Sequence, residues 1–267
     1  MRLGVGLAIT QPRSVAFSPL SLAPALWLDA ADTSTITASG GAVSQWNDKS
    51  GNGKHLAQTT AAAQPTTAAS TLNGRNVLTF DGGDWLQAST ANDWTFLHDG
   101  SASTVWIVAR AGNTANPLAA YTFAATANTN DGATRGWSLY YEDRSIASTN
   151  DSLRHAVTTG VPSNCVSNFS AADALPANTW ARLRVVTDAD AAIGADRSIM
   201  AVNNGSSIAN NTITSSVSGS VPSAPFTVGG RNLRLVGGVA EVIVVNGALT
   251  ANQIAAAESY LAAKWGL

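Results

Sequence analysis

The segment TVWIVARA at residues 104–111 carries the strongest fold signal in the sequence. In an extended strand, Val105 and Ile107 lie on one face, and Trp106 and Val108 lie on the other. Both faces are therefore apolar, which is typical of a strand that is covered on both sides. The segment predicts a central strand in a layered β structure.

Further strand-like runs lie on both sides of this segment, separated by turns rich in Asn, Asp, Gly and Ser. We expect strands at residues 25–29, 76–80, 136–141, 180–187, 198–202 and 239–245. The stretch 57–71 is rich in Ala, Thr and Gln and predicts irregular structure.

One helix is expected, from Thr250 to Lys264. Gln253 lies three residues after Thr250, which is the spacing of a capping box. Apolar residues then recur at helical intervals and form one stripe: Ile254, Ala257, Leu261 and Trp265. Many strands with a single terminal helix predict an all-β fold, a two-sheet antiparallel jelly-roll sandwich with a C-terminal helix.

Residues 1–24 precede the first strand and predict an extended N-terminal arm, with residues 25–267 as the jelly-roll domain. Three prolines interrupt the arm, and its apolar start lacks a cleavage-site pattern, so we expect it to remain in the mature protein. It has no pattern that could bury a face of its own. We therefore expect it to bind along a neighbouring subunit through its apolar side chains: Leu3, Val5, Leu7, Ile9, Phe17, Leu20 and Leu22. The alternative is a disordered terminus without a role.

The composition excludes several classes of partner. Charged residues make up 12% of the 267 residues and the net charge is −2, whereas typical soluble domains have about 25% charged residues. Nucleic-acid binding needs a positive footprint and a membrane span needs about 18 apolar residues, and the sequence has neither. Cys165 is the single cysteine, which excludes an internal disulfide. So low a charge favours a homo-oligomer or a multi-copy assembly.

Several separated motifs occur in a distinctive order. They are ALWLDAAD at 25–32, VSQWNDKSGNG at 43–53, LTFDGGDWL at 78–86, STVWIVAR at 103–110, FTVGG at 226–230, GVAEVIV at 238–244 and YLAAKWG at 260–266. Over residues 25–267, this order resembles the concanavalin A-like lectin/glucanase superfamily. It is most similar to the laminin-G-like jelly-roll domains found in bacteriophage structural proteins.

The resemblance implies a non-enzymatic structural protein of a bacteriophage virion. Such a protein decorates the capsid or belongs to the tail, and its partners are other virion proteins, which it would contact partly through the arm. The alternative is a carbohydrate-binding module that recognises a host surface glycan. The same fold hosts both roles, so the two remain open.

The carboxylates do not form the pattern of a glycoside hydrolase. Glucanases of the superfamily carry acidic residues at alternate positions of one strand, which brings the carboxylates to one face. Here Glu142 and Asp143 are adjacent, so a strand would point them to opposite faces, and Glu241 stands alone in an apolar strand. We therefore expect no catalytic residues and no enzyme activity.

Three tryptophans are candidates for stacking on a sugar ring: Trp85, Trp94 and Trp137. Trp85 and Trp94 flank a polar segment, and Trp137 follows a glycine in a strand-like run. Burial in the core is the alternative for each of them.

One loop has a partial calcium pattern. Asp48, Ser50 and Asn52 place oxygen-bearing side chains at alternate positions before Gly53, as in the first half of a calcium loop, but Thr59 stands where the bidentate glutamate would be. The alternative is an Asx-type turn. No cofactor is expected apart from this calcium ion.

Overall fold

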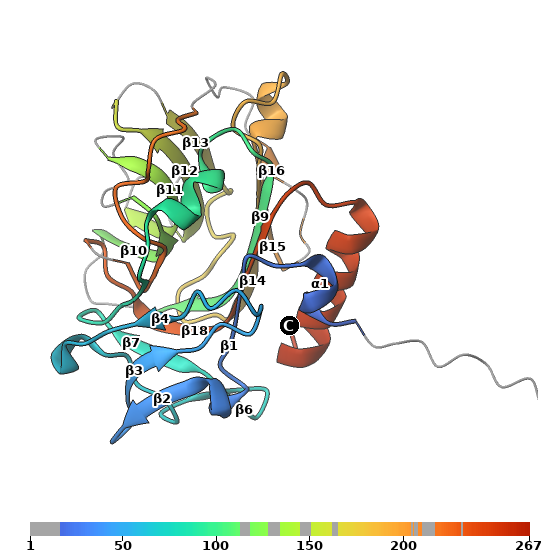
Figure 1. The fold of residues 1–267 in the computed structure, drawn as a ribbon. Coiled ribbons are helices and arrows are strands. Elements are labelled where there is room, and N and C mark those ends of the chain that lie inside the picture. Colours follow the sequence, from blue (N-terminus) through green and yellow to red (C-terminus); the bar gives the residue numbers. More distant parts are fainter. Residues whose placement is uncertain are drawn as a thin grey trace, which may run out of the picture.

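The computed structural model describes residues 17–112, 118–127, 134–144, 151–161, 165–203, 205, 208–209, 217–230 and 232–267. Within them, two antiparallel sheets pack face to face, and one long helix lies outside the sandwich (Figure 1). This confirms the all-β jelly-roll sandwich with a C-terminal helix. No helix in the described part of the chain combines the length and apolar character of a membrane-spanning segment.

The first sheet has seven strands. The main path runs β1-β18-β9-β14-β15-β16, and β7 also pairs with β18. The bounds are β1 Leu26–Asp29, β7 Leu78–Asp81, β9 Ser103–Ala111, β14 Ala181–Thr187, β15 Ser198–Val202, β16 Ile208–Ala209 and β18 Val236–Asn246.

The second sheet has nine strands in the order β13-β12-β11-β10-β17-β8-β4-β3-β2. The bounds are β2 Ile36–Ser39, β3 Ala42–Trp46, β4 Leu56–Ala57, β8 Leu86–Ala88, β10 Leu118–Ala125, β11 Arg135–Arg144, β12 Ser152–Thr159, β13 Cys165–Phe169 and β17 Thr227–Val228. A separate pair is formed by β5 Thr71–Leu72 and β6 Arg75–Asn76.

Strand β9 is the central strand that its sequence predicts. It lies between β18 and β14, and Val105 and Ile107 face the core between the two sheets. Trp106 and Val108 face the opposite way, into a second apolar cluster beneath the helix. Both faces are covered, which explains the uninterrupted apolar run.

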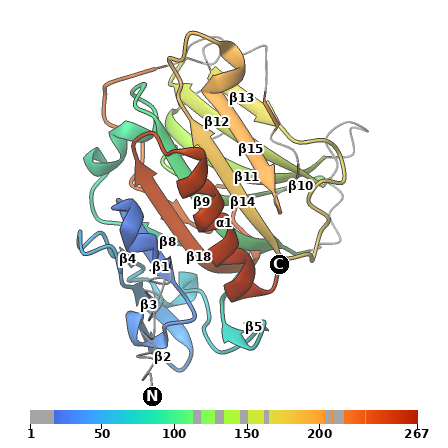
Figure 2. The ribbon, with the colours of Figure 1, turned by 90° about the vertical axis from the view of Figure 1, so that its right-hand side faces the viewer.

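Helix α1, Ala251–Trp265, crosses the outer face of the seven-stranded sheet (Figure 2). Thr250 and Gln253 form the expected capping box, and Gly266 ends the helix in the left-handed conformation. Ala257, Leu261 and Trp265 are buried against the sheet. Short 3₁₀ helices lie at η1 Pro19–Leu22, η2 Thr33–Thr35, η3 Ala61–Ala63, η4 Asn92–Leu97 and η5 Gly194–Arg197.

Candidate functional site

The three candidate sugar-stacking tryptophans lie in different environments. Trp94 and Trp137 are completely buried in the main core, where each packs near Phe226. Neither ring can stack on a sugar in this conformation, so burial corrects the expectation for these two residues. Trp85 is partly exposed, at the end of the turn that connects β7 to β8.

The strand that follows Trp85 presents polar atoms outward. Leu86 and Ala88 point into the core, so the alternation of the strand places Gln87, with Trp85 two residues before it, on the outer face of the nine-stranded sheet. Gln87 lies opposite Ala57 on one side and Thr227 on the other. Its Oε1 is buried and has no hydrogen-bond donor among the described residues, so a ligand on the surface does not reach it. The partly exposed Trp85 is the side chain in this region that is suited to stacking on a sugar ring.

Small and polar residues continue this row across neighbouring strands, and its last member, Thr227, is buried. Gln45 pairs with Ala57, Ala57 with Gln87, and Gln87 with Thr227. Gln45 is partly exposed, and its Nε2 donates to the side chain of Asn47 at 2.6 Å. These glutamines carry no distinctive sequence signal, because a Gln at an alternating position of a short strand resembles any solvated strand residue.

The proposed calcium residues organise a turn instead. The carboxylate of Asp48 accepts hydrogen bonds from the backbone N–H of Trp27, Ser50 and Lys54 at 2.8–3.0 Å, and from the Ser50 hydroxyl at 2.7 Å. The amide nitrogen of Asn52 donates to the carbonyl oxygen of Pro24 at 2.9 Å. These donors point at the oxygens that a cation would need, so the geometry favours the Asx-type turn. Among the described residues, no three His, Cys, Asp or Glu side chains gather into a group that could hold a metal ion.

We expect Asp48→Ala to lower the free energy of unfolding by about 1–3 kcal/mol, because it removes the acceptor of buried backbone N–H groups. Adding calcium should leave the melting temperature of the wild-type protein unchanged. Thermal melts with calcium and with a chelator check both points. Stabilisation by calcium that is lost in Asp48→Ala would restore the calcium interpretation.

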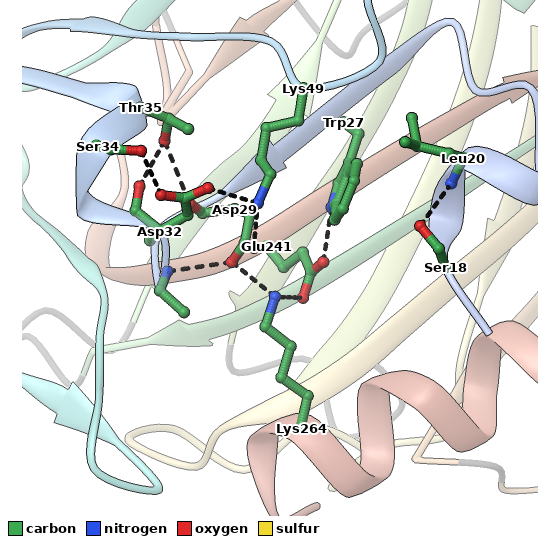
Figure 3. Close-up of polar contacts among 12 residues, drawn as sticks. Ser18, Leu20, Trp27, Asp29, Asp32, Ser34, Thr35, Lys49, Glu241 and Lys264 are labelled. Atoms are coloured by element: carbon green, nitrogen blue, oxygen red, sulfur yellow. Dashed lines mark hydrogen bonds and ion pairs between the residues drawn. The ribbon is translucent and has the colours of Figure 1, made fainter. Parts of the chain in front are cut away.

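A buried charged cluster holds α1 on the sheet (Figure 3). Glu241 of β18 is completely buried and accepts hydrogen bonds from Trp27 Nε1 at 2.8 Å, Trp265 Nε1 at 2.6 Å and the Tyr260 hydroxyl at 2.8 Å. Lys264 lies 2.9 Å from Glu241 and 2.6 Å from Asp29. Burial raises the pKa of Glu241, and Lys264 opposes this. The cluster is enclosed, so its role is to fix the position of α1 on the sheet.

Lys49 extends this cluster toward solvent. Its Nζ lies 3.0 Å from Asp29 and 2.7 Å from Asp32. Hydrogen bonds from Lys49 and Ser34 lower the pKa of Asp32. Figure 3 shows Asp29 between the two lysines, so one carboxylate links the rim of the sandwich to the helix.

Glu142 and His155 are buried and are held by neighbouring side chains. Glu142 is buried and lies 3.0 Å from Arg154. His155 is completely buried, with its Nδ1 2.8 Å from the Ser198 hydroxyl, and burial lowers its pKa to about 3. A neutral, enclosed histidine beside a serine fills the interior rather than meeting a substrate.

The expected assembly residues of the arm fall into two groups. Leu3, Val5, Leu7 and Ile9 lie outside the described residues. Phe17 and Leu22 pack on the cluster beneath α1, and the ring of Phe17 lies 5.7 Å from that of Tyr260. This corrects the expectation for Phe17 and Leu22, because they cover the domain itself. Leu20 is 50% exposed and stays available to a partner.

No family model matches the chain, and no curated protein sequence matches it. Several solved structures share its fold. The binding domain of botulinum neurotoxin DC in complex with SialylT is 11% identical, with a TM-score of 0.56, over 91% of this chain and 52% of that one. The ligand-binding domain of botulinum neurotoxin serotype D, solved with N-acetylneuraminic acid, is 12% identical, with a TM-score of 0.53, over 91% and 53%.

Domain 4 of AbnA, an extracellular arabinanase from Geobacillus stearothermophilus, was solved with arabinotriose. It is 13% identical, with a TM-score of 0.54, over 86% of this chain and 96% of that one. The chain therefore spans about half the length of the neurotoxin domains but nearly all of the arabinanase domain. At these identities the likeness establishes the jelly-roll β-sandwich fold.

Proposed function

We propose that this protein is a non-catalytic carbohydrate-binding module. Its ligand lies beside the turn between β7 and β8, where Trp85 stacks on a sugar ring. The observation that carries the proposal is the partial exposure of Trp85, whereas Trp94 and Trp137 are completely buried. Sugars have apolar ring faces, and an aromatic side chain that solvent reaches can stack on them.

The solved structures with this fold support the binding role. All three described above were determined in complex with a ligand, namely SialylT, arabinotriose or N-acetylneuraminic acid. These ligands belong to those proteins. The support is that the same fold binds such ligands in proteins that are 11–13% identical to this chain.

The glutamates support a binding role rather than hydrolysis. Glycoside hydrolysis needs two carboxyl groups facing the bond, about 5–9.5 Å apart. Glu142 pairs with Arg154, Glu241 binds Lys264, and Glu258 lies 3.5 Å from Arg182 and from Arg184. Each is buried in its own charge pair, so none is placed to protonate a bound glycan.

We expect Trp85→Ala to abolish binding on an array of immobilised oligosaccharides, and Trp85→Phe to retain part of it. Loss of one stacking ring removes about 1 kcal/mol or more beyond simple burial, which is enough to lose a weak sugar ligand. Leu20→Ala is the matched control, since it truncates an exposed apolar side chain on η1. Equal melting temperatures show that the variants are folded. Wild-type binding by Trp85→Ala, or release of reducing ends from any bound glycan, would contradict the proposal.

The role in a phage particle stays a prediction. A β-sandwich fold does not distinguish a virion protein from a free binding module. The two roles are compatible, because a protein displayed on a particle can also bind a host glycan. In that case Leu20 and the arm residues Leu3, Val5, Leu7 and Ile9 would contact the other virion proteins.

A further inference from the structure

The charged cluster beneath α1 brings an amine against a carboxyl group. Lys264 Nζ lies 2.6 Å from Asp29 Oδ1 and 2.9 Å from Glu241 Oε2 (Figure 3). Asp29 and Glu241 are direct partners in the antiparallel pair of β1 and β18, so their side chains leave the sheet on the same face. The helix supplies Lys264 to that face, and the three side chains therefore meet at one point.

Water has little access to this meeting point. The side chain of Glu241 is completely buried, that of Asp29 is 7% exposed and that of Lys264 is 12% exposed. The indole N–H groups of Trp27 and Trp265 each donate to one oxygen of Glu241. Lys264 Nζ lies 5.0 Å from the centre of the Trp265 ring. Charges in such a dry, aromatic site have lost most of their hydration, which makes the ionised form of the cluster costly.

The carboxyl group of Asp29 is held and polarised by two further donors. Lys49 Nζ donates to its Oδ2 at 3.0 Å, and the backbone N–H of Ala31 donates to its Oδ1 at 3.1 Å. A cation on one carboxyl oxygen stabilises the negative charge that develops there when a nucleophile adds to the carbon. The carbon of Asp29 is therefore prepared for attack by the neighbouring amine.

We propose that Lys264 and Asp29 join in an isopeptide bond, an amide between Nζ and Cγ, which forms once after folding with Glu241 as the proton carrier. Glu241 takes a proton from the Lys264 ammonium group, and the resulting amine adds to the carbon of Asp29. Glu241 passes this proton, and then a second proton from the nitrogen, to the departing oxygen. A carbon–nitrogen bond forms, a carbon–oxygen bond breaks and one water molecule leaves. The reaction occurs within one chain and has no turnover.

The geometry favours the amide over the separate groups. Reactants held in contact reach effective concentrations of about 10⁵–10⁸ M, which opposes the hydrolysis that amides undergo in dilute solution. The amide also replaces two opposite charges in a site where charges are costly. Burial raises the pKa of Glu241, which suits a group that must hold a proton in transit. The product ties α1 covalently to β1, so the helix cannot leave the sheet while this bond is intact.

Mass spectrometry detects the bond without any ligand. The purified chain should be lighter than its sequence by one water molecule. Trypsin cleaves after Lys and Arg but not after a lysine whose amine is part of an amide, so the digest should contain residues 14–49 joined to residues 235–267. A wild-type chain of full sequence mass that trypsin cleaves after Lys264 would overturn the proposal. Loss of water at any other place in the chain would also overturn it.

Three variants test the assigned roles, and circular dichroism establishes that each is folded. Glu241→Gln keeps the shape of the side chain and an acceptor oxygen but cannot carry the proton, so it should keep the full sequence mass. Lys264→Arg keeps the positive charge and should also lose no water. Lys54→Arg is the control, because Lys54 lies outside the cluster, over the ring of Trp94, and it should lose water like the wild type. Loss of water from Lys264→Arg would overturn the bond, and its loss from folded Glu241→Gln would overturn the role of Glu241.

Discussion

Replacing Trp265 with alanine should lower the free energy of unfolding by about 3–5 kcal/mol, the largest single-residue effect that we expect in the apolar cluster beneath α1. The Trp265 ring is completely buried between α1 and the seven-stranded sheet. Truncation leaves a large cavity there, and it also removes the N–H that donates to Glu241 at 2.6 Å. Urea denaturation followed by circular dichroism measures the loss.

Two further variants separate the causes of that loss. Trp265→Phe keeps most of the ring but lacks the N–H, so it should cost about 1–3 kcal/mol for the charged acceptor that loses a donor. Asn252→Ala changes an exposed position of the same helix and should stay within about 0.5 kcal/mol of the wild type. If Trp265→Ala costs less than about 1 kcal/mol, the helix is not docked through this ring.

Glu241→Ala should cost a similar amount, about 3–5 kcal/mol, for an electrostatic reason. The change leaves Lys264 with one carboxylate partner, Asp29, instead of two. It also leaves the indole N–H groups of Trp27 and Trp265 without an acceptor. A buried donor without an acceptor has lost its hydrogen bonds to water and has no protein partner, which destabilises the folded state. The same denaturation experiment detects the effect.

A double variant tests whether the charge pair is the cause. Combining Glu241→Ala with Lys264→Met removes both charges, so the loss should be smaller than the sum of the two single losses by about 0.5–3 kcal/mol. Strict additivity would show that Glu241 does not stabilise the fold through Lys264.

The sequence predicts the fold correctly in those elements whose apolar pattern is uninterrupted. Strand β9 and helix α1 show this, since Val105 and Leu261 lie in the patterns that predict them. Strand β12 differs, because Arg154 and His155 break its apolar pattern. His155 nevertheless faces the core, where its partner Ser198 comes from the opposite sheet. A partner supplied by a distant strand leaves no local signal.

The candidate site could be predicted only in part for the same reason. Their neighbours in the sequence make Trp85, Trp94 and Trp137 equal candidates, and only the packing of the two sheets separates the two buried rings from the partly exposed Trp85. The spacing of Asp81 and Asp84 predicts a tight turn, but not the burial that raises the pKa of Asp84. Glu241 is a further case: a lone acid in an apolar strand is unexplained until β1 and α1 bring Trp27 and Lys264 to it.

Glycan binding at Trp85 is tested most directly by following the tryptophan indole N–H resonances of the protein while oligosaccharides are added at pH 5. If Trp85 stacks on the sugar, a binding glycan shifts the Trp85 resonance and leaves the resonances of the buried Trp46 and Trp94 in place. A glycan that shifts other indole resonances and leaves Trp85 unmoved would contradict it, as would a broad oligosaccharide panel that moves none of them.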